Sequence, residues 1–265
     1  MTWPFENDTS AITKKLANKS LKSEKRRNLM VVIAVALASC LICFSIVMAL
    51  STRQIEKNHV EDTYEAVYTR ITEEDVSTLK GLDDFSRVGE YYMLAVEPAE
   101  QGYNASYIYC DEETMYIARD QMKLLEGRLP QKEDEVVVSR YFLSNYGSDA
   151  GIGEKVMLSS ESFHGEYTVT GIMEGYKEKE VNGSSILLSK EALKGWSGYD
   201  PADYRAYVHF KNEQQMDETE LTARSREIAK EYQLEMPIMN LSYMKFYKQP
   251  VNVSMLALVA GIAVL

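Results

Sequence analysis

The sequence predicts an α+β protein with three parts. These are an N-terminal transmembrane helix, a mixed α/β extracytoplasmic domain, and the start of a second transmembrane helix. Three observations predict this arrangement: residues 29–50 carry no charge, strand-like and helix-like patterns alternate through residues 51–250, and residues 251–265 again carry no charge. Strands interleaved with helices are typical of a mixed α+β domain.

The first apolar segment, residues 29–50, is long enough to cross a bilayer once. As a helix it measures about 33 Å at about 1.5 Å per residue, and a bilayer core is about 30 Å thick. Its clearly polar residues are Ser39 and Ser45. A buried core helix is the alternative, but such helices seldom run so far without a charge. Ala34 and Ala38 form a small-x-x-x-small pair that predicts a helix-packing face, with lipid-facing alanines as the alternative.

The charges around this segment predict its orientation. Arg53 and Lys57 follow it closely, whereas the preceding residues include Lys14, Lys15, Lys19, Lys22, Lys25, Arg26 and Arg27. Positive charge concentrates on the cytoplasmic side of membrane proteins, so residues 1–28 are predicted to be a cytoplasmic leader at the cell membrane. A cleaved signal peptide would have an apolar region of only about 7–15 residues, which favours an uncleaved anchor here.

The predicted outer part of the chain is strongly acidic. The whole chain has a net charge of −11, and removing the cations of the leader together with Glu6, Asp8 and Glu24 leaves 22 basic and 37 acidic residues, a net charge of −15. This charge excludes nucleic acid held through its phosphates and a domain lying flat on an anionic membrane. It leaves open the attraction of a cationic peptide.

Cysteine usage predicts that the outer domain has no internal disulfide. Cys40 and Cys43 lie within the first apolar segment, and Cys110 is the one cysteine beyond it. The domain must therefore be stabilised by its core.

The end of the chain predicts the start of a second transmembrane helix at residues 251–265. Pro250 suits the first turn of such a helix, because its missing N–H costs nothing there. A complete span needs about 20 residues, so this one is predicted to be truncated and the sequence to be a fragment. A C-terminal core element of the outer domain is the alternative. The predicted domains are residues 1–28, 29–50, 51–250 and 251–265.

Within residues 51–250, capping residues and alternation predict the elements. Thr72 opens a helix whose acidic first turn suits its N-terminus and which stops near Gly81. Ser139 and Asp217 cap two further helices, and period-two alternation predicts the strands. The full set is helices at 71–82, 140–146, 189–195 and 217–232, a helical turn at 115–125, and strands at 88–96, 103–110, 135–138, 155–159, 166–172, 184–188 and 205–210.

The sequence predicts no catalytic, cofactor-binding or metal-binding site. His59, His164 and His209 are scattered and have no Cys, His or carboxylate at the spacing of metal ligands. Neither a nucleophile elbow nor a phosphate-binding loop occurs. His209, in an alternating strand, is expected to face solvent in a structural role. We therefore predict a protein without cofactors that is not itself an enzyme.

The order of short motifs between the two apolar segments resembles a known family. A basic leader runs directly into the first span. A Gly-Arg-x-Pro turn at residues 127–130 is followed by a strand and a helix, then by Gly-x-x-Val at residues 153–156 and Val-x-Gly-Ile at residues 169–172. This order resembles the MacB/FtsX-like family of ABC-transporter permeases. The motif residues, predicted to be structural, are Gly127, Arg128, Pro130, Glu135, Gly147, Gly153 and Gly171. Their glycines are expected to form turns with positive φ.

The resemblance implies both a fold and a function. It implies a MacB-type core of two subdomains between the first and second of four spans, in a homo- or heterodimer with a second permease. A cytoplasmic ABC ATPase would drive export or mechanotransmission, with a peptide or lipoprotein as substrate. The later spans and the coupling loop where the ATPase docks are not in this sequence. Two alternatives stay open: a membrane-bound sensor with a ligand-binding outer domain, and a membrane-anchored enzyme.

Overall fold

The computed structural model describes residues 10–98, 104–146, 149–175 and 178–248. These residues belong to two compact units: an N-terminal helical unit that extends through Ile55, and a domain formed by Glu56–Pro250. The predicted second span lies outside the described residues, as does the motif residue Gly147.

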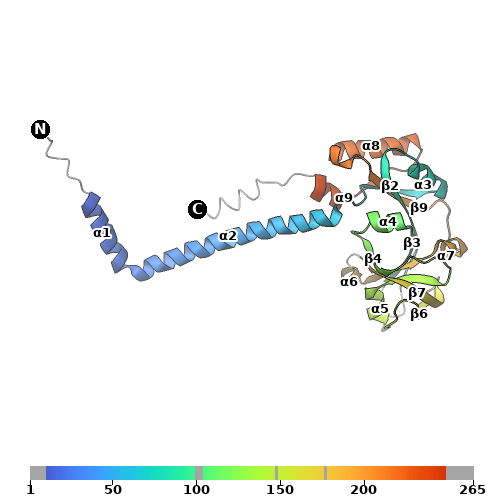
Figure 1. Cartoon of the computed structure of the whole chain (residues 1–265), viewed down its shortest axis with the longest axis horizontal. Coiled ribbons are helices and arrows are strands. Elements are labelled where there is room, and N and C mark those ends of the chain that lie inside the picture. Colours follow the sequence, from blue (N-terminus) through green and yellow to red (C-terminus); the bar gives the residue numbers. More distant parts are fainter. Residues whose placement is uncertain (1–9, 99–103, 147–148, 176–177, 249–265) are drawn as a thin grey trace. The chain divides into compact units, whose positions relative to one another are not determined.

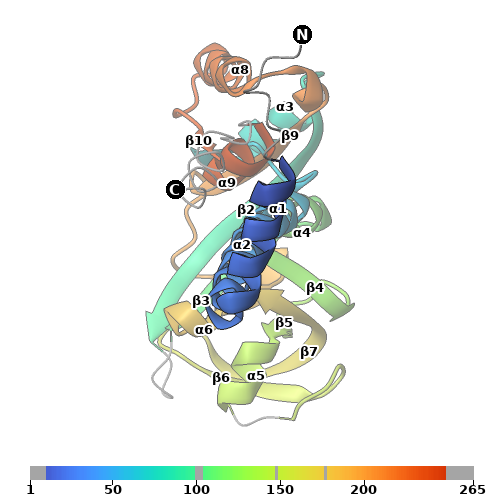
Figure 2. The same ribbon diagram turned by 90° about the vertical axis from the view of Figure 1, so that its left-hand side faces the viewer.

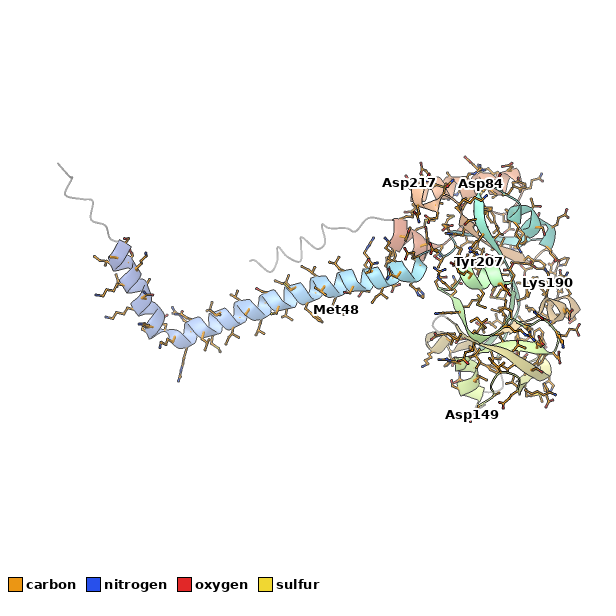
Figure 3. All side chains as sticks on the ribbon, viewed as in Figure 1. Met48, Asp84, Asp149, Lys190, Tyr207 and Asp217 are labelled. Atoms are coloured by element: carbon orange, nitrogen blue, oxygen red, sulfur yellow. The ribbon has the colours of Figure 1, made fainter. Side chains whose placement is uncertain are left out.

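The N-terminal unit contains the predicted apolar helix. It consists of α1 (Ser10–Ser23) and most of α2 (Lys25–Val60), and α2 includes the whole segment 29–50. Among the described helices, α2 is the one that is long and apolar enough to cross a membrane, and its apolar side chains are exposed. Figure 3 shows side chains projecting from α2 along its length, Met48 among them.

The two serines of this apolar segment are satisfied within the helix. The Ser39 hydroxyl donates to the Val35 carbonyl at 2.9 Å, and the Ser45 hydroxyl donates to the Leu41 carbonyl at 2.8 Å. Polar groups inside a bilayer need internal partners because lipid offers none. These serines are therefore compatible with a spanning helix.

The domain is built on one mixed sheet, which has ten strands in its described part. The strands are β1 (Ala66–Ile71), β2 (Phe85–Pro98), β3 (Asn104–Cys110), β4 (Met122–Gly127), β5 (Glu135–Ser139), β6 (Lys155–Ser159), β7 (His164–Gly175), β8 (Gly183–Leu188), β9 (Tyr204–Phe210) and β10 (Ile238–Met239). Their order is β10-β1-β9-β2-β3-β8-β5-β7-β4, and β6 pairs with β7 off this path. The β3–β8 and β5–β7 pairs are parallel, and the other pairs are antiparallel.

Short helices connect the strands. They are α3 (Glu73–Lys80), α4 (Glu112–Ile117), α5 (Arg140–Tyr146), α6 (Glu178–Val181), α7 (Lys190–Gly195), η1 (Glu213–Gln215), α8 (Glu218–Glu231), α9 (Leu241–Tyr243) and η2 (Met244–Lys248). Within the domain, α3 and α8 lie at one end of the sheet, whereas α5 and α6 lie at the other end near β7 (Figure 1). Figure 2 shows the long strands β2 and β3 running between these two ends.

The helix starts follow the predicted caps. The Thr72 hydroxyl accepts the N–H of Asp75 at 3.1 Å, and the Asp75 carboxylate accepts the N–H of Thr72 at 2.8 Å. Asp217 and Glu220 make the same reciprocal pair at the start of α8, at 2.9 Å each. Ser139 caps α5 in the simpler one-bond form. The predicted starts of α3, α5 and α8 are confirmed, because capping depends on residues three apart in the chain.

Alternate strand residues fill two cores, one on each face of the sheet. Val136 and Val138 of β5 belong to the larger core, and Val137 belongs to the smaller one. In β9, Val208 packs in the larger core and Tyr207 in the smaller. Successive side chains of a strand point to opposite faces, so the central strands are covered on both sides.

The predicted helical turn at 115–125 is correct only for residues 115–117. The chain is helical earlier, in α4, because Asp111 accepts the N–H of Thr114 at 2.8 Å and starts the helix there. Residues 122–127 form β4 instead, paired antiparallel with β7. Strand β1, also absent from the prediction, pairs with β9 and β10. In both places distant partners supply the pairing, and no local pattern reveals them.

The sheet is continuous across its two halves. One half contains β10, β1, β9, β2 and β3, and the other contains β8, β5, β7 and β4. They join through the parallel pairing of β3 with β8, from Asn104–Gly183 to Ile108–Leu187. Glu56–Pro250 forms one compact unit on a single sheet, and the division into two subdomains stays a prediction.

Candidate functional site

The motif residues lie around the loop that joins β4 to β5. Two guanidinium nitrogens of Arg128 donate to the Glu135 carboxylate at 2.8 Å each. The backbone N–H groups of Gln131 and Lys132 donate to the same carboxylate at 2.8 and 3.3 Å. The Arg128 hydrogen bonds, together with these N–H groups, lower the pKa of Glu135 to about 2. The loop, with half-buried Pro130, is thereby attached to the first residue of β5.

The motif glycines act in two different ways. Gly127 has a φ of +84°, and a Cβ there would lie 2.2 Å from the Thr170 carbonyl oxygen. Gly153 has a φ of +89° and open space around it. The expectation of positive φ is wrong for Gly171, where a Cβ would lie 2.9 Å from the Arg128 carbonyl oxygen. At that position the glycine permits close approach of two backbones instead of a turn.

The three histidines stay apart in the fold. His59 lies in the last turn of α2, His164 begins β7, and His209 lies in β9. No group of three or more His, Cys, Asp or Glu side chains that could hold a metal ion occurs in the described ranges. Cys110 is buried in the smaller core, where burial raises the pKa of its thiol.

The place where the chain enters and leaves the domain is the strongest candidate for a functional site. We call it the terminal junction and define it as residues 57–67 and 238–248. There β1 pairs with β10. The Asn240 N–H donates to the Glu65 carbonyl at 2.8 Å, and the Asn240 side-chain amide donates to the Tyr64 carbonyl at 3.0 Å. The entering and leaving segments are thus hydrogen-bonded side by side.

A buried carboxylate, that of Glu65, lies within the terminal junction. It contacts His209 Nδ1 at 2.8 Å and accepts the Phe210 N–H at 2.8 Å. Burial lowers the pKa of His209, but the hydrogen bond and charge of Glu65 outweigh burial and raise it overall. The His209 side chain is only 14% exposed, so the expectation that it faces solvent is wrong. Its partner is 144 residues away in the sequence.

A second buried ion pair holds the leaving segment. Lys248 Nζ lies 3.2 Å from Glu213 Oε2 and also donates to the Glu213 carbonyl, and both side chains are less than a tenth exposed. Lys57 Nζ of α2 lies 4.9 Å from the ring centre of Tyr247, which stacks on Tyr243 at 5.1 Å. Separating a buried pair leaves a buried charge unpaired, so these contacts favour one arrangement of the junction.

A charge network attaches α3 and α7 to the sheet elsewhere in the domain. Lys190 Nζ lies 2.6 Å from Glu90 and 2.7 Å from Glu73, and Lys80 Nζ lies 2.9 Å from Asp111. Figure 3 shows Lys190 at the α7 side of the domain. Each cation has an acidic partner, so we interpret this network as structural.

Residues 29–226 match the family model of the MacB-like periplasmic core domain, which is more than half of the chain. The chain belongs to this family. The match begins in the apolar segment of α2 and ends in α8, so the MacB-like domain and the helix before it are recognised together. The resemblance to MacB/FtsX-like permeases is confirmed. A comparison with curated proteins gives no significant match.

Solved structures resemble the MacB-like domain at low identity. The extracellular domain of the noncanonic ABC-type transporter YknZ from Gram-positive bacteria is 15% identical with a TM-score of 0.48, covering 67% of this chain and 100% of that chain. A domain of a putative permease from Porphyromonas gingivalis is 15% identical with a TM-score of 0.46, covering 74% and 96%. The periplasmic region of MacB from Actinobacillus actinomycetemcomitans is 10% identical with a TM-score of 0.49, covering 70% and 91%. The family assignment rests on the match to the family model.

Proposed function

We propose that this chain is the permease subunit, or a fragment of one, of an ABC transporter of the MacB/FtsX type. The observation that carries the proposal is the family match over residues 29–226, which includes an apolar helix and the MacB-like domain in one stretch. The permease would not be an enzyme. A cytoplasmic ABC ATPase would hydrolyse ATP, and the permease would convert that reaction into movement of its outer domain for export or mechanotransmission.

The proposed topology follows from charge and hydropathy. Residues 1–28 would lie in the cytoplasm, residues 29–50 would span the cell membrane, and residues 51–250 would lie outside it. Residues 251–265 would begin the second span. The cations before the first span support this orientation.

The path of force would run through the terminal junction. Helix α2 continues without a break to Val60, which is 1% exposed in the larger core. Thr63 and Glu65 follow and are fully buried, and β1 begins at Ala66. A displacement of this helix would therefore pass into the sheet through packed residues. Since the leaving segment is bonded to the same residues, both tethers would move the same edge of the sheet.

The proposed partners are a cytoplasmic ATPase and a second permease, in a homo- or heterodimer. Ala34 and Ala38 lie four residues apart on α2, so they share a face that could pack against another helix. A peptide or lipoprotein is the proposed substrate.

Co-purification tests this function directly. The full-length gene product should purify in mild detergent with an ABC ATPase and ATP-hydrolysing activity. Purification without an ATPase, from a gene neighbourhood that encodes none, would contradict the proposal. The sensor alternative predicts a cytoplasmic signalling region after the second span, whereas the permease predicts further spans.

Cysteine labelling tests the orientation. In a background with Cys40 and Cys43 replaced by Ser, Glu161→Cys should react with a membrane-impermeant maleimide on intact cells. Thr13→Cys should react only after lysis. Buried Cys110 serves as an internal control that stays unlabelled. Labelling of Thr13→Cys on intact cells would contradict the proposed orientation and indicate the opposite one.

A further inference from the structure

An open cleft of about 1090 Å³ lies at the end of α2, within the domain. Its wall includes Glu56 and His59 of α2, Asp120 in the connection from α4 to β4, Tyr141 of α5 and Glu178 of α6, together with residues of β4 and β7. Sites for small organic ligands are typically about 300–1,000 Å³. The cleft therefore has room for a ligand much larger than a metal ion.

Asp120 is the exceptional residue of this wall. It is 8% exposed, and its Oδ1 has no hydrogen-bond partner among the described residues. Burial raises the pKa of its carboxyl to about 6. Buried polar groups in native proteins are nearly always hydrogen-bonded, so this carboxylate oxygen indicates a donor that lies outside the described residues.

Two basic residues next to Asp120, Arg119 and His59, contact backbone oxygens. Arg119 donates to the carbonyls of Glu61 and Asp62, and it lies 3.7 Å from the Asp62 carboxylate. His59 Nε2 lies 3.1 Å from the backbone oxygen of Asp120. The other buried acid of the wall, Glu178, accepts backbone N–H groups. Of the two buried acids of the wall, Asp120 is thus the one with an unpartnered oxygen in the described part of the chain.

The chemistry of the missing donor is that of an organic cation. A metal ion would need several ligands, and the described ranges contain no cluster of His, Cys, Asp and Glu that could hold one. An ammonium or guanidinium group gives a carboxylate a charge-assisted hydrogen bond. The acidity of the chain favours cations in general. The wall also contains Lys123 and Lys179, which suit an acidic group on the same ligand.

We propose that the cleft beside α2 binds a ligand through an ammonium or guanidinium group, with Asp120 as the anion that receives it. Since Oδ1 is covered, binding includes a rotation of the Asp120 side chain toward the cleft. A bound ligand would touch α2 on one side and α5 and α6 on the other, and would link the end of the helix to the second half of the sheet. Ligand binding in this cleft does not depend on an ATPase partner. The cleft proposal and the proposed transporter function can therefore be contradicted independently.

Titration calorimetry on the full chain in nanodiscs tests the proposal. The probe is the tripeptide alanyl-lysyl-glutamate, and the control ligand is the same peptide with both amines acetylated. The test variant is Asp120→Asn. Its matched control is Asp149→Asn, which removes the same charge from an exposed residue outside the cleft wall. Thermal unfolding of each variant verifies that it is folded.

The wild-type chain and Asp149→Asn should bind the tripeptide alike, and Asp120→Asn should bind at least about tenfold more weakly. Neither the wild-type chain nor the two variants should bind the acetylated peptide well. Equal affinities in both variants, or no binding by the wild type to any amine, would overturn the proposal. If nanodiscs rich in an amine-headgroup lipid raise the wild-type melting temperature and the tripeptide does not bind, the cation comes from lipid. If calcium or magnesium chloride reproduces the effect at equal concentration, a metal site replaces the proposed one.

Discussion

Buried acidic side chains in this domain differ in whether they have a basic partner. Glu65 and Glu213 each have a basic partner within 3.2 Å. Asp120 has no such partner for its Oδ1 within the described part of the chain. A charge that is buried without a partner is costly, so the Asp120 carboxyl opposes folding when it is ionised. Asp120 therefore contributes to the pH dependence of the domain's stability.

Asp120→Asn should stabilise the domain at neutral and alkaline pH. The pKa of Asp120 rises from 3.8 to about 6 on folding, so the folded state holds its proton more tightly than the unfolded state does. Stability therefore falls as pH rises through this window, and the full cost applies above it. Urea unfolding should show a gain of about 1–3 kcal/mol near pH 8 and much less near pH 4. A gain that is the same at both pH values, or that also appears in Asp149→Asn, would contradict this explanation.

Two motif glycines offer a matched comparison of conformational strain. Gly127→Ala places a Cβ against the Thr170 carbonyl at a position with positive φ, whereas Gly153→Ala meets open space at a similar φ. Gly153→Ala should lower the free energy of unfolding by about 1–2 kcal/mol, the cost of the left-handed conformation alone. Gly127→Ala should cost clearly more, since the β4–β7 pairing must also shift. Chemical unfolding of both variants measures the difference, and equal costs would show that the close approach is unimportant.

At the scale of elements, local signals determine where helices start, and long-range pairing determines which segments become strands. The starts of α3, α5 and α8 follow from caps that can be seen in the sequence. Strand β4 and strand β1 depend on partners far along the chain, and the sequence analysis missed both. The terminal junction also depends on long-range contacts, because Glu213 contacts Lys248, which lies 35 residues later in the chain.

The buried Glu213–Lys248 pair should behave as a unit. Lys248→Met leaves the Glu213 carboxylate buried without its cation, so it should lower the free energy of unfolding by about 3–5 kcal/mol. The double variant Lys248→Met with Glu213→Gln should recover much of that loss, because no buried charge remains. A double-mutant cycle by urea unfolding measures the coupling. Additive losses would mean that the two side chains do not interact in solution.

At the scale of the whole molecule, the chain combines one apolar helix with a MacB-like domain. The helix and the domain are matched together by one family model. Within the domain, the residues that follow α2 are buried, and the proposed function assigns them the transmission of force. The dimer contact is the part of this proposal that one substitution can test.

Ala34→Leu should weaken assembly of the full-length permease. A bulky side chain at a small-x-x-x-small face keeps two helices apart, whereas Ala36→Leu on the opposite side of α2 adds the same bulk away from that face. Crosslinking of epitope-tagged copies in native membranes should fall for Ala34→Leu and stay unchanged for Ala36→Leu. Equal crosslinking in both variants would favour lipid-facing alanines.

The sequence by itself determined the features that neighbouring residues control. The apolar length of residues 29–50, the helix caps and the strand alternation are all local, so they could be recognised without a structure. The ordered motif from Gly127 to Gly171 identified the family for the same reason. Each signal lies within a short stretch, and the physics behind it acts within that stretch.

Only the tertiary structure decided what distant residues do to one another. It placed His209 against Glu65, turned residues 122–127 into a strand, gave Gly171 a packing role, and buried Asp120 Oδ1 without a partner in the described part of the chain. Burial and pairing are properties of the folded chain, because they depend on which segments the sheet order brings together. The candidate sites of this protein consist of such contacts, which is why no sequence pattern named them.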